Sequence, residues 1–147
     1  MLTRLLMFAA VLLLASCGRH APPATPNASM WGIPIEYRQG DPAGNLVGLA
    51  EHRVGGCVVT VLYVDPWILG HEATHCWVEQ HGVPDGWEGV ACIVQEPWRC
   101  TAEEALADWT AVAIVKAGCL PGDLGWPGGE VGGCVAPDPA STTRRSR

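Results

Sequence analysis

The stretch CVVTVLYVDPWILGHEATHCWVEQHG, residues 57 to 82, contains the elements that decide the predicted fold. Its first part, residues 57 to 64, is β-branched and apolar and ends at an Asp-Pro pair, which predicts a strand. Asp65 then suits the N-cap of a helix, and Pro66 suits its first turn. Because a glycine closes the stretch and can terminate that helix, we predict a helix over residues 66 to 81.

A second helix is predicted further along the chain, over residues 102 to 117. Thr101 suits its N-cap, Lys116 lies at the negatively polarised end of the helix, and Gly118 can close it. The intervening residues, 82 to 99, are dense in Gly, Pro and Trp, which is typical of an irregular loop. One strand and two helices in a chain of 147 residues predict a single small α+β domain.

The chain begins with the features of an export signal. Arg4 precedes an apolar run over residues 5 to 14, which is too short for a membrane span. The sequence LASC, residues 14 to 17, resembles the bacterial lipobox, in which the chain is cut before the cysteine and the cysteine is lipidated. This resemblance implies a signal peptide over residues 1 to 16 and a lipid on Cys17. The alternative is an ordinary secreted protein in which Cys17 has no such role.

The rest of the chain divides into three parts by composition. Residues 17 to 30 are rich in Pro, Ala and small polar residues, which predicts a tether between lipid and domain. The domain itself is predicted over residues 31 to 135, and residues 136 to 147 form a flexible tail. Gly18 after the cysteine resembles the sorting pattern of outer-membrane lipoproteins. The predicted location is therefore the bacterial cell envelope, anchored in the outer membrane and facing the periplasm.

Charge and cysteine content agree with that location. Without residues 1 to 16 the chain has 8 Lys and Arg against 15 Asp and Glu, a net charge of −7 that argues against nucleic acid as a partner. Six cysteines besides Cys17 predict three disulfides formed in an oxidising compartment. The absence of a CxxC pair argues against a cysteine-based zinc site, and only a local Cys92–Cys100 bridge is suggested among the pairings. The six are Cys57, Cys76, Cys92, Cys100, Cys119 and Cys134.

The first predicted helix carries the sequence HEATH, in which His71 and His75 lie four residues apart. On a helix that spacing places both imidazoles on one face, one turn apart, with Glu72 beside them. This is the HExxH arrangement, in which two histidines bind zinc and the glutamate takes a proton from water on the metal. The alternative is a solvated helix face on which the two histidines have no common role.

A catalytic zinc usually has three protein ligands and keeps one position for water, so a third ligand is needed. His81 has the spacing of the metzincin pattern HExxHxxGxxH, but Val78 replaces the glycine at which that family turns its chain. The other candidates, Glu103 and Glu104, lie at the start of the second helix. Glu104 also completes a capping box with Thr101, which would give it a purely local role.

The HEATH sequence and the downstream pattern ExxADxxA together resemble the gluzincin family of zinc metallopeptidases. The resemblance implies that Glu104 is the third zinc ligand and that Asp108 orients one of the zinc histidines. It also implies a disulfide-stabilised, zincin-like domain with an active-site helix, a second ligand helix and a short sheet. Ala107 and Ala111 would let the two helices approach closely.

The activity implied is hydrolysis of peptide bonds in a peptide or protein substrate, with zinc as cofactor and Glu72 as general base. In that family a strand also pairs with extended substrate, and residues 57 to 64 are placed in sequence to do this. Members often add a side chain that stabilises the tetrahedral oxyanion. If this chain has one, the candidates are Tyr63, His52, His81 and Arg99.

The rival interpretation is a zinc-containing envelope lipoprotein that acts in binding or assembly and has no catalytic activity. A closed site, with His81 or a cysteine as fourth ligand, would favour that rival, whereas an open site with Glu72 near the metal would favour an enzyme. A related enzyme would act on the peptide stems of the cell wall with the same chemistry. The sequence does not indicate an oligomeric state.

Overall fold

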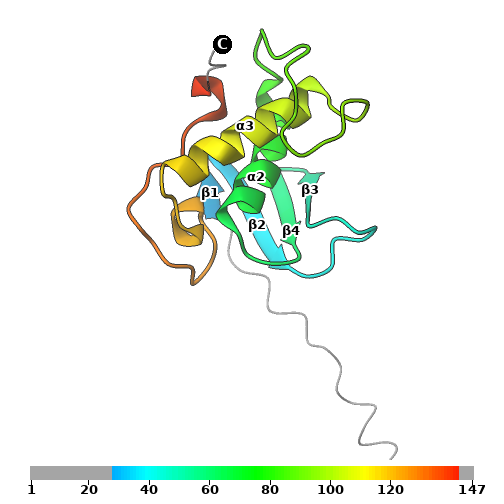
Figure 1. Ribbon diagram of the computed structural model, residues 1–147. Coiled ribbons are helices and arrows are strands. Elements are labelled where there is room, and N and C mark those ends of the chain that lie inside the picture. The colour runs from blue at the N-terminus through cyan, green and yellow to red at the C-terminus, as the bar shows by residue number, and fades with distance from the viewer. Residues whose placement is uncertain (1–27, 143–147) are drawn as a thin grey trace, which may run out of the picture.

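The computed structural model describes residues 28 to 142. The predicted signal peptide, Cys17 and most of the tether lie outside the described residues, as do residues 143 to 147. The described chain contains four strands and two α-helices, with two short 3-10 helices near its C-terminal end (Figure 1). The predicted α+β class with a short sheet is confirmed.

The strands form one mixed sheet in the order β1-β2-β4-β3. They are β1 (Ala28–Met30), β2 (Ile33–Gln39), β3 (Gly48–Arg53) and β4 (Gly56–Val61). Strand β2 runs parallel to β4, whereas β1 is antiparallel to β2 and β3 is antiparallel to β4. The predicted strand over residues 57 to 64 is therefore β4, which lies inside the sheet, and β3 forms an edge.

Both predicted helices are confirmed, as α2 (Pro66–His81) and α3 (Ala102–Lys116). Asp65 caps α2, because its Oδ1 accepts hydrogen bonds from the backbone N–H groups of Trp67 and Ile68 at 2.8 and 3.3 Å. Thr101 caps α3 by accepting a hydrogen bond from the Glu104 N–H at 3.2 Å. Helix α2 packs on the sheet, and α3 packs on α2 (Figure 1).

The core lies between the sheet and α2. Ile35 and Val59 from the sheet and Leu69 and Ala73 from α2 have no exposed surface. The two helices approach closely at Gly70. A Cβ atom added there would lie 3.6 Å from the Ala111 Cα and 2.5 Å from the Ile114 Cδ1, so a larger residue would not fit. Ala107 and Ala111 are fully buried, in agreement with small residues between the helices.

Three disulfides are present, as the cysteine count predicts. Cys57–Cys76 joins β4 to α2, and Cys119–Cys134 joins the end of α3 to the C-terminal segment. Cys92–Cys100 is the local bridge that the sequence suggests, and it closes a loop before α3. A domain this small buries a limited apolar area, so these links contribute to its stability.

The folded part of the chain extends beyond the predicted domain limits. At one end, β1 includes residues assigned to the tether, and it pairs with β2. At the other end, the segment assigned to a flexible tail forms the 3-10 helix η2 (Pro139–Ser141), in which Pro139 is buried. The Thr142 hydroxyl lies 3.3 Å from the Thr110 hydroxyl of α3. Packing against α3 thus orders this segment despite its polar composition.

The other 3-10 helix, η1 (Pro121–Leu124), supports the sheet. The Tyr37 hydroxyl of β2 donates a 2.7 Å hydrogen bond to the Leu124 carbonyl oxygen. Within residues 28 to 142, no helix is both long and apolar enough to span a membrane.

Candidate metal centre

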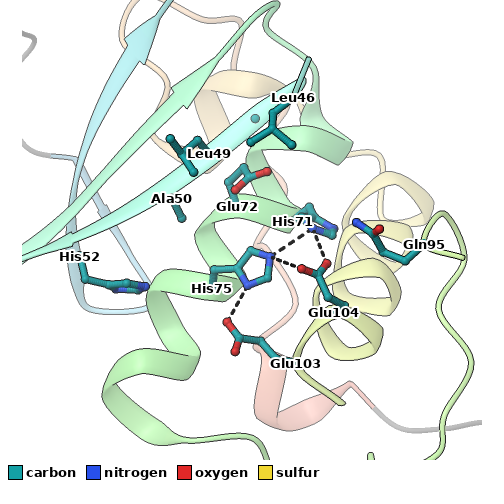
Figure 2. A pocket seen from close by; sticks show the side chains of 11 residues that line it. Leu46, Leu49, Ala50, His52, His71, Glu72, His75, Gln95, Glu103 and Glu104 are labelled. Atoms are coloured by element: carbon teal, nitrogen blue, oxygen red, sulfur yellow. Dashed lines mark hydrogen bonds and ion pairs between the residues drawn. The ribbon is translucent and has the colours of Figure 1, made fainter. Parts of the chain in front are cut away.

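His71, His75 and Glu104 meet where α2 packs against α3 (Figure 2). The Nε2 atoms of His71 and His75 are 3.2 Å apart. Glu104 Oε2 lies 3.4 Å from His71 Nε2, and Glu104 Oε1 lies 3.8 Å from His75 Nε2. Each residue offers one ligand atom, and these three atoms lie within 4.8 Å of one another. These residues, which we call the metal cluster, could hold a metal ion.

The chemistry of the metal cluster fits a metal. Two imidazole nitrogens and one carboxylate oxygen are common ligands of zinc and other transition metals. Glu104 Oε2 is buried and accepts no hydrogen bond from the part of the chain that the structure describes. A buried carboxylate oxygen without a donor is costly, and a bound cation would satisfy it.

Asp108 orients His71 from the side opposite the metal cluster. Its Oδ1 lies 3.1 Å from His71 Nδ1, and its side chain has no exposed surface. Its Oδ2 accepts hydrogen bonds from the N–H groups of Ile93 and Val94 at 2.5 and 3.0 Å. Burial opposes ionisation, but these contacts outweigh it and hold the pKa of Asp108 below its usual range. A charged Asp108 favours hydrogen on Nδ1, which leaves Nε2 free for a metal.

The surrounding carboxylates also act on the charge of His71. Burial disfavours its protonated form, but the nearby carboxylates of Asp108 and Glu104 prevail and raise the pKa of His71 to about 9. The contact with His71 in turn lowers the pKa of Glu104 despite the partial burial of that carboxyl group. A metal that binds His71 therefore has to replace a proton.

Glu103 contacts the other histidine on its outer nitrogen. Its Oε1 lies 2.7 Å from His75 Nδ1, which leaves His75 Nε2 directed to the metal cluster. The structure therefore places Glu103 against the outer nitrogen of His75, whereas Glu104 belongs to the metal cluster. Within α3, the Glu104 backbone contributes to the helix cap while its side chain faces the metal cluster.

His81 lies away from the metal cluster, at the last residue of α2. Its Nδ1 hydrogen bonds to the Trp77 carbonyl oxygen at 3.0 Å, and its ring stacks on the Trp77 ring with centroids 4.6 Å apart. The structure therefore does not bring the third histidine of the HEATHCWVEQH stretch to the other two. A different ring covers His71, because Trp67 stacks on it at 5.0 Å between centroids.

Glu72 is next to the metal cluster and faces β3. Its side chain is 8% exposed, and burial raises its pKa even though the neighbouring histidines oppose this. A Cβ atom added to Gly48 would lie 2.5 Å from Glu72 Oε1, so only a glycine leaves room for the carboxylate in this position. Gly48 is a site residue that the sequence analysis missed.

A cleft opens over the metal cluster, with β3 along one wall and the loop before α3 along the other (Figure 2). Leu46, Leu49, Ala50 and His52 line the first wall, and Gln95 comes from the second. Of the four oxyanion candidates taken from the sequence, His52 alone lines this cleft. Tyr63, His81 and Arg99 do not line it, whereas Gln95, which is not one of the four candidates, does.

The strand that borders the cleft is β3, which corrects the prediction for residues 57 to 64. Strand β4 has β2 on one side and β3 on the other, so its backbone is not available to a substrate. The Val47 carbonyl oxygen accepts a hydrogen bond from Leu62 N–H at 2.9 Å. Because hydrogen bonding alternates along antiparallel strands, the backbone groups of Gly48, Ala50 and His52 face away from β4.

No known protein family, curated protein or solved structure gives a significant match to this chain. The geometry of the metal cluster and of its cleft is therefore the basis for a functional proposal.

Proposed function

We propose that this protein is a zinc metallopeptidase of the gluzincin type, with His71, His75 and Glu104 as zinc ligands. The observation that carries the proposal is the convergence of these three side chains beside a buried Glu72 at the floor of an open cleft. A zinc ion held by these three residues would polarise a substrate carbonyl group and activate a water molecule.

The roles of the chain's own residues follow from their positions. Glu72 takes a proton from the attacking water and later delivers it to the nitrogen of the leaving amine. Asp108 and Glu103 hold the imidazoles of His71 and His75 in the orientation that a metal needs. A general base beside the metal cluster, with a carboxylate behind each histidine, supports a zincin-like interpretation of the fold.

The edge of β3 supports an extended peptide as the substrate. Its outward backbone groups can pair with a peptide laid along the cleft, which would add a strand to the sheet. Leu46 and Leu49 flank this edge and offer apolar contacts to substrate side chains. The proposed substrate is thus a protein segment or, with the same chemistry, a cell-wall peptide stem.

The number of protein ligands distinguishes the proposed enzyme from its rival, the non-catalytic zinc lipoprotein. Three ligands leave a coordination position for water, whereas four would close the site. Over residues 28 to 142, the potential ligands near one another are His71, His75 and Glu104. His81 bonds to the backbone of α2, and the six domain cysteines are all in disulfides. These observations support a site with three protein ligands.

The location proposed for this activity is the bacterial cell envelope. Three disulfides agree with an oxidising compartment, and the net negative charge does not favour nucleic acid. The lipid on Cys17 and the outer-membrane anchor belong to the same proposal.

The test compares the purified wild-type protein with Glu72→Gln and Glu104→Ala. Zinc content and hydrolysis of a quenched fluorescent peptide library are measured for each. We expect one zinc per chain in wild type and Glu72→Gln, zinc loss in Glu104→Ala, and hydrolysis by wild type alone. Zinc without hydrolysis would favour the non-catalytic rival. Absence of zinc from a correctly disulfide-bonded wild type would overturn both interpretations.

A further inference from the structure

Gln95 is a polar side chain in the cleft, and the mechanism proposed above assigns it no role. It projects from the loop before α3, and its amide end points toward His71 and Glu104 (Figure 2). The amide has no hydrogen-bond partner among residues 28 to 142, although it is half-buried. An amide with two N–H donors and no partner is available to a ligand in the cleft.

The backbone leading to Gln95 is firmly held, which distinguishes it from an ordinary loop side chain. The two residues before it, Ile93 and Val94, donate their N–H groups to the buried Asp108 carboxylate. The Cys92–Cys100 disulfide closes the loop around these residues. The Trp109 side chain adds a hydrogen bond from Nε1 to the Ala91 carbonyl oxygen at 3.2 Å.

Asp108 thereby connects Gln95 to the metal cluster. One of its oxygens orients His71, and the other fixes the backbone next to Gln95. The same buried carboxylate thus sets the positions of a metal ligand and of an amide donor, and the donor needs little reorganisation to act in catalysis.

We propose that the Gln95 amide stabilises the oxyanion of the tetrahedral intermediate, a role that rests on the proposed peptidase function. When water adds, a new C–O bond forms, the carbonyl π electrons move to the oxygen, and Glu72 takes the proton. When the C–N bond breaks, the electron pair returns to the carbonyl group and the amine nitrogen receives the proton. A neutral amide donates to the oxyanion without a proton transfer of its own.

His52 is the competing donor, and the geometry favours Gln95. His52 lies in the exposed half of β3, and its ring is beyond His75 on the side away from Glu104 (Figure 2). Gln95 instead approaches the part of the metal cluster formed by His71 and Glu104. Glu72 of α2 lies on the β3 side of His71, so a carbonyl group placed between Glu72 and Gln95 would meet both side chains.

The test uses the zinc-loaded full chain and a probe that does not require turnover. The probe is the end-protected phosphinic analogue of Ala-Ala, in which a tetrahedral phosphorus with two oxygens replaces the peptide group. Gln95→Ala is compared with Gln95→Glu, which keeps the size but removes the donor, and with His52→Ala. Gln39→Ala is the matched control, because Gln39 is exposed at the end of β2.

We expect both Gln95 variants to bind one zinc and to bind the probe about 10- to 100-fold more weakly than wild type. Their kcat for peptide hydrolysis should fall about 100-fold or more, with little change in KM. Gln39→Ala should match wild type. Unchanged probe affinity in the Gln95 variants, or a loss confined to His52→Ala, would overturn the role of Gln95.

Different results would refute the peptidase function and the role of Gln95. A wild type that binds zinc and probe but cleaves no peptide would refute the peptidase function, while the variant affinities would still decide whether Gln95 is the donor. A zinc-loaded wild type that does not bind the probe would refute the Gln95 proposal.

Discussion

Replacing Asp108 with asparagine tests the contact that joins the metal cluster to the loop carrying Gln95. Asparagine has nearly the same shape, and its single oxygen can still accept from the N–H groups of Ile93 and Val94. Its NH2 group would then face His71 Nδ1, 3.1 Å away in the wild type. Because two donors cannot pair, His71 must move its hydrogen to Nε2, the nitrogen that faces His75 and Glu104.

We expect Asp108→Asn to change two quantities, the metal affinity and the free energy of unfolding. Loss of a partner that orients a metal-binding histidine weakens metal binding by about 10- to 100-fold, or about 1.4 to 2.8 kcal/mol. The two backbone hydrogen bonds become neutral, and each is then weaker by about 1 kcal/mol. We therefore expect the metal-free Asn variant to lose about 2 kcal/mol of unfolding free energy.

The loss of zinc affinity and the loss of unfolding free energy can be measured separately. Zinc affinity is obtained by competition with a chromophoric chelator, and the unfolding free energy is obtained by urea titration in the presence of EDTA. Asp85→Asn is the control, because Asp85 is exposed in the loop after α2. An unchanged zinc affinity in Asp108→Asn, with a normally folded protein, would refute the argument that Asp108 sets the tautomer of His71.

Three further predictions concern other parts of the structure. Gly48→Ala should displace the Glu72 carboxylate and lower kcat by up to about 100-fold, while zinc content stays at the wild-type value. Replacing Cys57 and Cys76 together with alanine should cost about 3 kcal/mol of unfolding free energy in denaturant titrations, since the bridge closes a loop with a sequence separation of 19. Backbone N–H groups lower the pKa of Asp123, so its stabilising contribution is present above the unfolded pKa and lost as pH falls through the folded pKa. Unfolding curves recorded from neutral to acidic pH should therefore depend less on pH in Asp123→Asn than in wild type.

Local sequence signals were sufficient for the two helices. Asp65 and Thr101 accept hydrogen bonds from the first turns of α2 and α3, as N-cap residues do wherever they occur. The spacing of His71 and His75 likewise needs only helical periodicity to place both rings on one face. Strand β2 carried a usable signal that was missed, because its buried Ile33, Ile35 and Tyr37 alternate with more exposed residues.

Strand β3 had no such signal. An edge strand beside a cleft is polar and only partly buried, so its sequence, GLAEHR, lacks the apolar alternation of a core strand. The roles of Gly48, Glu103 and Gln95 were also beyond local reasoning, because each depends on a side chain from a distant segment.

Local patterns in the chain were thus enough to predict the two helices, the number of disulfides and the pair of histidines, because caps, cysteine count and helical spacing do not depend on distant segments. Tertiary structure alone decided that Glu104 faces the histidines and that Glu103 lies behind His75. It also decided that β3, and not β4, borders the cleft. These choices depend on how α3 packs against α2 and how the strands are ordered in the sheet, and no local pattern encodes either arrangement.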